Sequence, residues 1–199
     1  SYFGRLSYNF NDRYLVYGTM RADGTSKYQE KWGYFPSVGA GWVISEETFM
    51  SDIGGIDFLK IRGGWGKLGN DKIEPSNGAN TLTLPTTALN GQLVTGAVSS
   101  TSFAYLQWEL TEEWNVGVTS RLLNERLSLD ADYYVRDTKD AAITLRSTTG
   151  DTFLRSNGVI RNSGFEVALN WHDNLDNGLT YTIGANFATL KNESRDLYG

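Results

Sequence analysis

The sequence predicts an all-β fold: a segment of about eight antiparallel strands from the wall of a transmembrane up-and-down β-barrel. Three observations favour this fold. Several strand-like runs are about as long as the roughly 9–11 residues that a tilted strand needs to cross a bilayer. Their connections alternate between short turns and long polar loops, as in barrels with tight turns on one side of the membrane. Apolar and polar residues also alternate within the runs, so each strand has two different faces.

The predicted strands follow one another along the whole chain. They are residues 2–10, 13–22, 34–44, 57–68, 111–123, 125–136, 162–172 and 179–190. Short connections are expected at Asn11-Asp12, around Asn124 and at 173–178, and one of moderate length at 45–56. Long loops are expected at 23–33, 69–110 and 137–161. Every second connection is therefore long, which is typical of a membrane barrel.

The run 125–136 shows the alternation most clearly. Its odd positions are apolar and its even positions are mostly polar. The odd set is Leu127, Leu129, Ala131, Tyr133 and Val135, and the even set is Ser128, Asp130, Asp132, Tyr134 and Arg136. Runs 111–123, 162–172 and 179–190 alternate in the same way. An apolar face toward lipid and a polar face toward a wet lumen account for this pattern.

A soluble β-sandwich would alternate too, with its apolar face turned inward. Two features favour the membrane barrel. Charged residues lie well inside the predicted strands, on the face that a wet lumen would hydrate: Asp130, Asp132, Arg136 and Glu166. Aromatic residues recur near strand ends, where the membrane interface would hold them. These are Tyr2, Phe10, Tyr14, Trp42, Phe58, Trp114, Tyr133, Trp171, Tyr181 and Phe187.

The composition narrows the classes of protein. With 40% hydrophobic residues and a mean hydropathy of −0.37, the chain is too polar for a helical membrane protein. It has no run of about 18 apolar residues that could form a spanning helix. A net charge of −5 and a pI near 4.9 argue against nucleic acid as a partner. The chain has no cysteine, which excludes disulfides and thiolate metal sites within it.

The two ends favour an internal piece of a larger barrel. Ser1-Tyr2-Phe3-Gly4 begins within a strand pattern and lacks the features of a signal peptide. The polar residues 191–199 are expected to begin another long loop. Because the last strand of a closed barrel pairs with its first, such ends suit a complete barrel poorly. A complete eight-stranded barrel remains an alternative.

Several motifs resemble those of the SusC/RagA family of TonB-linked outer-membrane transporters from Bacteroidota, and they follow one another in the same order as in that family. They span nearly the whole chain, so the resemblance is specific. They include Asp12-Arg13-Tyr14-Leu15, Arg21-Ala22-Asp23-Gly24-Thr25-Ser26-Lys27-Tyr28, the run 32–42 (WGYFPSVGAGW), the run 58–66 (FLKIRGGWG) with Gly69-Asn70, the run 108–117 (WELTEEWNVG), Asp132-Tyr133-Tyr134 and Asn162-Ser163-Gly164-Phe165-Glu166.

This resemblance implies a 22-stranded barrel with an N-terminal plug, of which residues 1–199 form part of the C-terminal barrel domain. The signal peptide, the plug and the final strands would lie outside this chain. The implied activity is nutrient import across the outer membrane, with oligosaccharides or peptides as substrates. A SusD-type surface lipoprotein would act as a lid, and the TonB-ExbB-ExbD complex would supply energy. The resemblance implies no enzyme activity and no cofactor.

Other chemical interpretations are weaker. Gly64-Trp65-Gly66-Lys67-Leu68-Gly69 fits a dinucleotide-binding pattern, but the loop and proline that follow do not begin the helix that this site needs. We therefore place these glycines in a wall strand.

Asp130 and Asp132 share a strand face about 7 Å apart, a spacing that a glycosidase pair could use. Pairing with Arg121 or Arg136 on neighbouring strands, or simple hydration, is the favoured interpretation. His172 is the sole histidine, so neither a zinc site nor a catalytic triad is indicated, and we expect a solvated turn residue. Asp23-Gly24-Thr25-Ser26 lacks the further ligands of a calcium loop and is expected to form a turn.

Substrate contacts, if this chain makes them, are expected in the long loops or the upper lumen, because a rigid scaffold positions such loops. Within 69–110, Tyr105 and Trp108 are the candidate substrate-binding residues, since aromatic faces stack on sugar rings or cover peptide side chains. Packing of these rings against neighbouring loops or a lid protein is the alternative.

Three classes of function stay open: a segment of a TonB-dependent importer, a small standalone barrel that acts as receptor or adhesin, and an outer-membrane enzyme. The second requires the strands to close on themselves within this chain. The third requires a catalytic constellation that the sequence does not contain. We favour the importer.

Overall fold

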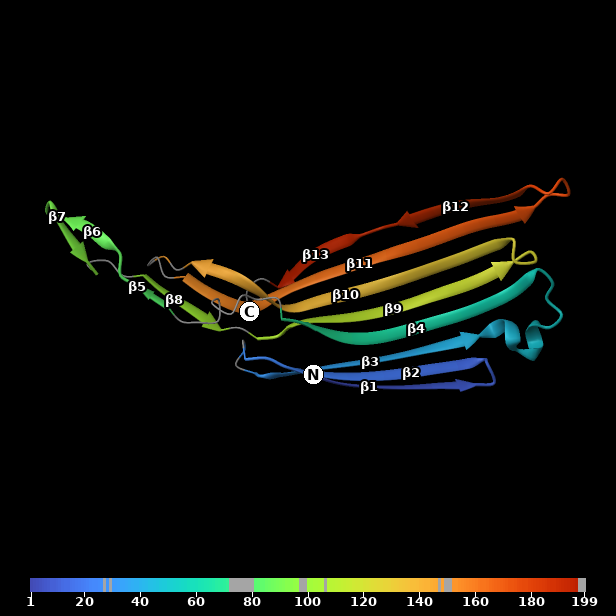
Figure 1. Cartoon of the computed structure of the whole chain (residues 1–199), viewed down its shortest axis with the longest axis horizontal. Coiled ribbons are helices and arrows are strands. Elements are labelled where there is room, and N and C mark those ends of the chain that lie inside the picture. The colour runs from blue at the N-terminus through green and yellow to red at the C-terminus, as the bar shows by residue number, and fades with distance from the viewer. Residues whose placement is uncertain are drawn as a thin grey trace.

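A computed structural model of the chain describes residues 1–26, 28, 30–71, 81–96, 100–105, 107–146, 148 and 152–196. Eight long strands form most of it (Figure 1). They are β1 (Tyr2–Phe10), β2 (Tyr14–Gly24), β3 (Trp32–Val43), β4 (Ile56–Asn70), β9 (Glu109–Leu122), β10 (Leu127–Arg146), β11 (Thr152–Asn174) and β12 (Thr180–Ala188). The short strands are β5 (Thr81–Thr83), β6 (Thr86–Leu89), β7 (Gln92–Thr95), β8 (Ser100–Tyr105) and β13 (Lys191–Asp196). Two single-turn 3-10 helices, η1 (Ile44–Glu46) and η2 (Thr48–Met50), connect β3 to β4.

The long strands form one sheet in which neighbours in sequence are neighbours in space. The order is β1-β2-β3-β4-β9-β10-β11, and all of these pairs are antiparallel. β11 then pairs with β12 and β13 along its later part, and with β8 in parallel at its start. The long strands lie side by side, while β5 to β8 extend beyond one end of them (Figure 1). This meander confirms the predicted all-β, up-and-down arrangement.

The sheet is open in the part of the chain that the structure describes. β1 pairs only with β2 there, and β12 and β13 lie at the opposite side of the sheet. The strands therefore do not close on themselves, as a standalone eight-stranded barrel would require.

The strand registers join the predicted faces into two continuous surfaces. One row of directly paired residues crosses eight strands and is apolar throughout. It runs Phe10, Tyr14, Trp42, Ile61, Val118, Ala131, Val167 and Phe187. These side chains share one side of the sheet because side chains alternate along each strand. We call this side the apolar face and the opposite side the polar face.

The tight turns all lie at one end of the sheet. Phe10 pairs with Tyr14, so residues 11–13 form the first turn. Asn11 and Asp12 have φ values of 53° and 56°, the positive values of hairpin turns that match the right-handed strand twist. Asn9 supports this turn by donating to Asp12 Oδ1 at 2.5 Å. Leu123, Asn124 and Glu125 turn β9 into β10, also with positive φ, and Gly178 does so between β11 and β12 at φ 83°. The three predicted short connections are therefore confirmed.

The predicted long loops are partly wrong. Residues 137–146 and 152–161 continue β10 and β11, with a bulge at Asp140 (φ 58°), so most of the expected loop 137–161 is strand. The expected loop 69–110 contains β5 to β8. Residues 191–196, expected to begin a loop, form β13, because the chain returns to β11 after an irregularity at Thr189. There the Thr189 hydroxyl accepts a hydrogen bond from the backbone N–H of Phe165 at 3.0 Å, which links the end of β12 to β11 at the irregularity.

The described residues form little core. Only Tyr28, Phe35, Val43 and Trp108 are buried hydrophobic residues, and Ser120 is the one buried polar residue among those described. Large side chains of the apolar face stand exposed instead, among them Leu6 at 77%, Ile183 at 65% and Trp114 at 63%. None of the described helices is long and apolar enough to span a membrane. A single sheet with an exposed apolar face requires another apolar medium or partner against that face.

Candidate functional site

The apolar face has the layout of a membrane-crossing surface. Aromatic side chains border it at both ends: Trp171 donates to the Tyr181 hydroxyl at 3.3 Å near the tight turns, and Trp65 lies 6.0 Å from Trp114 toward the other end. Trp114 to Leu122 is nine residues, and a tilted strand of that length spans about 20 Å. This height is close to the apolar band of outer-membrane barrels.

A row of ion pairs lies directly beyond Trp65 and Trp114. The Glu112 carboxylate lies 2.6 Å from Lys139 Nζ and 3.8 Å from Lys67 Nζ. Asp137 binds Arg161 through two hydrogen bonds of 2.5 Å. Charged side chains cost free energy when they are placed in the hydrocarbon interior of a bilayer, so a row of them is expected outside it. The apolar band therefore ends between Trp114 and Glu112.

Phe58 does not join the predicted aromatic border. It lies on the polar face, where the Arg121 guanidinium stands 5.8 Å from its ring centre. Phe58 keeps the register of Lys60 and Arg62 with β9, so it shares their face, and the register irregularity displaces only Ile56.

The polar face carries a network around Arg62. This guanidinium lies 2.5 Å from Asp132 and 3.7 Å from Asp130, and it also donates to the Thr119 hydroxyl. Thr119 in turn donates to Asp130 at 2.8 Å. The network therefore joins β4, β9 and β10 across the sheet.

The predicted partners of the two aspartates were wrong. Arg121 pairs with Glu125 at 3.9 Å, and Arg136 pairs with Glu113 at 2.6 Å. Arg62 takes their place although it lies two strands away from Asp132. Both aspartates contact this one arginine in a structural network, which is the arrangement expected of wall residues.

Glycine makes the Arg62–Asp132 contact possible. Gly117 lies between the two residues in the paired row Arg62, Gly117, Asp132. A Cβ atom at Gly117 would lie 2.0 Å from Asp132 Oδ1, so any side chain there would displace the carboxylate.

Tyr17 uses a second glycine in the same way. Its ring lies over Gly39 on the next strand, where a Cβ would be 2.3 Å from the ring. Its hydroxyl reaches 3.7 Å from the Cβ position of Gly64, one strand further on. Arg5 lies over the ring on the other side, 5.5 Å from its centre.

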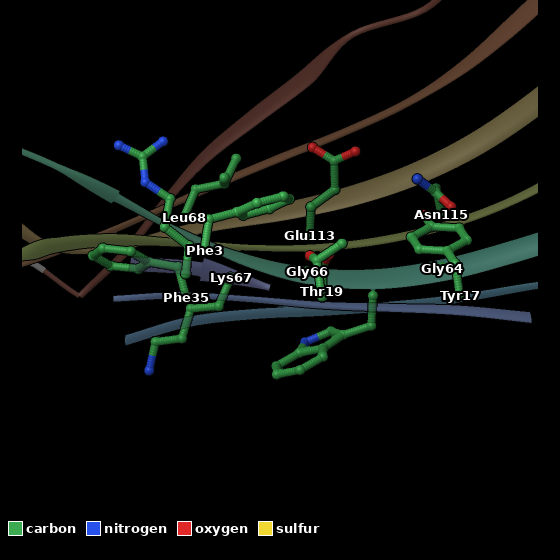
Figure 2. Close-up of a pocket in the computed structure, with 13 residues that line it drawn as sticks. Phe3, Tyr17, Thr19, Phe35, Gly64, Gly66, Lys67, Leu68, Glu113 and Asn115 are labelled. Carbon is green, nitrogen blue, oxygen red and sulfur yellow. The ribbon is translucent and has the colours of Figure 1, made fainter. Parts of the chain in front are cut away.

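Two hollows follow the polar face along this part of the sheet. The first, which we call the upper hollow, has a volume of about 310 Å³, and its lining includes Phe3, Tyr17, Thr19, Ser37, Glu113 and Asn115. In Figure 2, Glu113 and Asn115 project to one side of the sheet, and Lys67 projects to the other. The second, the middle hollow, has about 390 Å³ and lies beside Lys60, Arg62 and Asp132. Tyr17 and Asn115 line both hollows, which are therefore adjacent.

Trp108 belongs to a buried aromatic cluster at the end of the sheet opposite the tight turns. Its ring centre lies 5.0 Å from that of Tyr28 and 5.4 Å from that of Phe35, and 6% of the residue is exposed. Its indole N–H donates to the carbonyl of Glu30 at 3.0 Å. Tyr28 donates to the carbonyl of Asn70 at 3.1 Å, and burial raises the pKa of its phenol. The cluster thus fastens the β2–β3 connection to the ends of β4 and β9.

Tyr105 is the last residue of β8, which pairs in parallel with the start of β11. The side chain of Tyr105 lies outside the part of the chain that the structure describes, and Trp108 does not line the upper or middle hollow. Contact of these two residues with a substrate stays a prediction.

Glu47 organises the tight-turn end of the sheet. Its Oε1 accepts from the Tyr14 hydroxyl at 2.6 Å and from the Trp42 indole at 3.0 Å, and Arg13 lies 3.5 Å from Oε2. The hydrogen bond from Tyr14, supported by Trp42 and Arg13, holds the pKa of the Glu47 carboxyl below its usual value. This cluster joins the aromatic border to the β3–β4 connection.

The remaining motifs are structural. Gly64, Gly66 and Gly69 lie within β4, which confirms their prediction as wall residues. His172 lies in β11 and faces Thr182 at 3.1 Å, so its placement in a turn was wrong. The described ranges contain no group of three or more side chains that could hold a metal ion.

The sequence did not reveal Arg62, Tyr17 and Asn115 as members of one surface. The alternation places each of them on the polar face of its own strand. Which residues become neighbours depends on the registers of β2, β3, β4 and β9, which no local pattern specifies. The signal that could have indicated the contacts is the glycine opposite each long polar or aromatic side chain.

The chain matches the family described as "TonB dependent receptor-like, beta-barrel" over residues 1–198. It is 32% identical to the TonB-dependent receptor SusC of Bacteroides thetaiotaomicron, over 100% of this chain and 21% of that protein. It is also 32% identical to the TonB-dependent receptor P26 of Formosa agariphila, over 100% of this chain and 21% of that protein. The chain therefore spans about a fifth of the length of these curated relatives.

Solved structures share the fold. The RagAB peptide importer in its "open-open" state matches with a TM-score of 0.84 and 24% identity, over 98% of this chain and 22% of that chain. The "closed-closed" state of the same importer matches with a TM-score of 0.81 and 23% identity, over 99% of this chain and 22% of that chain.

Proposed function

Because the chain belongs to the TonB dependent receptor-like β-barrel family, we propose that it forms part of the wall of a nutrient importer. The family is one of outer-membrane receptors rather than enzymes, and the outer membrane is where this chain lies. Its apolar face turns to lipid, and its polar face turns to the lumen. The long connections then lie on the extracellular side and the tight turns on the periplasmic side.

The observation that carries the proposal is the open, two-faced sheet. One face offers exposed apolar side chains bordered by aromatic rows, and the other carries the Arg62 network and the two hollows. Such a sheet with unpaired outer strands suits a segment of a larger barrel. It counts against the alternative of a small standalone receptor or adhesin, whose first and last strands would pair.

The finer parts of the proposal concern the whole protein. We propose that residues 1–199 are part of a C-terminal barrel domain and that a plug domain and further strands belong to the same protein. Similarity over a fifth of SusC supports this arrangement. The imported nutrient is an oligosaccharide or a peptide, and the peptide importer RagAB supports the second class. A SusD-type surface lipoprotein is the proposed lid.

The proposed energy source is the proton-motive force, delivered by the TonB-ExbB-ExbD complex. Uptake by cells that express the full-length protein tests this directly. We expect a supplied mixture of oligosaccharides and peptides to be depleted only when the protein is present and only without a protonophore. Depletion that a protonophore leaves unchanged would identify a passive pore and contradict the proposal.

A further inference from the structure

We propose that a charged patch on the outside of the wall, directly beyond the apolar band, binds the phosphate groups of an anionic glycolipid in the outer leaflet of the membrane. The proposal goes beyond nutrient import. It uses only the outer-membrane location and the assignment of the apolar face to lipid. Because the patch lies outside the lumen, its test does not depend on transport.

A row of directly paired charged residues crosses five strands on the side of the long connections. It consists of Lys67, Glu112, Asp137, Arg161 and Glu193. Glu112 is two residues from Trp114, so the row faces the same side of the sheet as the apolar face. Lys139 joins the row through Glu112, and Lys191 and Arg195 join it through Glu193. We call these eight residues the outer charged patch.

Basic residues outnumber acidic ones in the outer charged patch by five to three, although the whole chain has a net charge of −5. Glu193 lies 2.5 Å from Lys191 and 3.6 Å from Arg195, just as Glu112 is shared by two lysines. One carboxylate balances only one of its two cations, so positive charge remains for an external anion. The side chains of Lys191, Arg195 and Lys139 are 70%, 51% and 42% exposed, so such an anion can reach them.

The tight-turn end of the sheet has the opposite balance of charge. Residues 11–13, 44–57, 123–126 and 173–179 together contain eight acidic residues and only two basic ones. A surplus of basic residues is therefore not a general feature of the strand ends. It occurs on the outward surface at the end that meets the outer leaflet, where basic side chains attract anionic lipid head groups.

Exposed rings lie next to the patch, where the acyl chains of a bound lipid would run. Tyr133 and Phe165 pair directly with each other, four residues from Asp137 and Arg161 along their strands. They share the outward side with the patch because four residues are two full periods of a strand. Both are nearly half exposed. A lipid with its phosphates at the patch would therefore pack its chains on these rings.

The test measures lipid binding by the purified full-length protein in detergent. The probe is a fluorescently labelled lipid A with two phosphates, and its anisotropy reports binding. Lys139→Gln/Lys191→Gln removes two exposed cations of the patch. Lys31→Gln/Lys60→Gln is the matched control with the same change of charge, because Lys31 lies in the β2–β3 connection and Lys60 lies beside the middle hollow on the polar face.

We expect the patch variant to bind the probe about tenfold more weakly than wild type and the control variant to bind it equally well. Glu193→Gln should bind it about fivefold more tightly, because it leaves Lys191 and Arg195 without their carboxylate. A patch with a purely structural role would not give this gain. Unlabelled lipid A should displace the probe, whereas lipid A without phosphates and millimolar inorganic phosphate should not.

Equal affinities in all four proteins, with each shown to be folded by heat-modifiable mobility, would overturn the proposal. Displacement by lipid A without phosphates would overturn it in favour of binding through the acyl chains alone, and displacement by inorganic phosphate in favour of a free anion. A patch variant with altered oligomeric state and unchanged lipid binding would make the patch a protein contact and overturn it too. Energy-dependent nutrient uptake that persists in any of these cases leaves the importer function intact.

Discussion

Arg62 on β4 reaches Asp132 on β10 over the whole width of β9, with 2.5 Å between guanidinium and carboxylate. The contact exists because the residue between them is Gly117, which leaves room for the Asp132 side chain. Both side chains are one-third exposed, so the pair itself contributes only about 1 kcal/mol. The pair also links β4 and β10 across β9 on the polar face.

Gly117→Ala should therefore destabilise the barrel. The added methyl would lie 2.0 Å from Asp132 Oδ1 and force the carboxylate away from Arg62. Gly63→Ala is the matched control, because its methyl would meet only the Asn115 carbonyl at 3.5 Å and alanine there gains about 0.4–1 kcal/mol through the unfolded chain. We expect Gly117→Ala to be less stable than Gly63→Ala by about 1–2 kcal/mol. Thermal unfolding of the full-length protein in detergent measures the difference, and identical transitions would contradict the role of Gly117.

Arginine substitutions at two successive positions of β11 should have different effects on folding, because the two side chains lie on opposite faces of the sheet. Val167 lies on the apolar face near the middle of the band, and arginine there should cost about 2–4 kcal/mol. Ala168 lies on the polar face opposite Asp130, so arginine there gains a carboxylate partner. We expect Val167→Arg to reduce the folded fraction in outer membranes and Ala168→Arg to leave it near wild type. A gel assay of heat-modifiable mobility reports this fraction, and equal yields of the two variants would mean that the faces are assigned wrongly.

The alternation of apolar and polar residues was enough to predict these two faces, and the turn-forming residues Asn11-Asp12 and Asn124 predicted the tight turns. The extension of β10 beyond Arg136 could not be predicted from the sequence. There the outward side chains become Asp137 and Lys139, so the apolar signal stops although the backbone ladder continues outside the membrane. The partnership of Arg62 with Asp132 was equally hidden, because it depends on the register of three strands rather than on any local pattern.

The Glu47 cluster should respond to pH. The folded pKa of this carboxyl is lowered by its hydrogen bonds, so its contribution to stability is fully present above the ordinary glutamate pKa. That contribution is lost as pH falls through the lowered pKa. Glu47→Gln keeps the acceptor for Tyr14 and Trp42 but has no charge. We expect wild type to melt at a higher temperature than Glu47→Gln near pH 6, and the gap to close toward pH 3. A gap that widens on acidification would reverse the sign of the predicted effect.

The Trp108 cluster should act as a fastener for the β2–β3 connection. Trp108→Ala removes a buried ring that packs on Tyr28 and Phe35, a loss of about 3–5 kcal/mol in a well-packed site. Trp114→Ala removes an exposed ring of the apolar border and serves as the control. Limited proteolysis of the full-length protein should cut near Tyr28 and Glu30 faster in the first variant only. Unchanged cleavage together with slower nutrient uptake would instead indicate the substrate-binding role predicted for Trp108.

The most direct test of the lipid-and-lumen assignment is a cysteine scan along β9. The chain has no cysteine of its own, so single substitutions at residues 114, 115, 116, 118 and 119 of an otherwise cysteine-free full-length protein can each carry one fluorescent label. In bilayers with brominated lipid chains, we expect strong quenching at 114, 116 and 118 and weak quenching at 115 and 119. Uniform quenching along the strand, or the opposite alternation, would contradict a wall with its apolar face in lipid and its polar face toward the lumen.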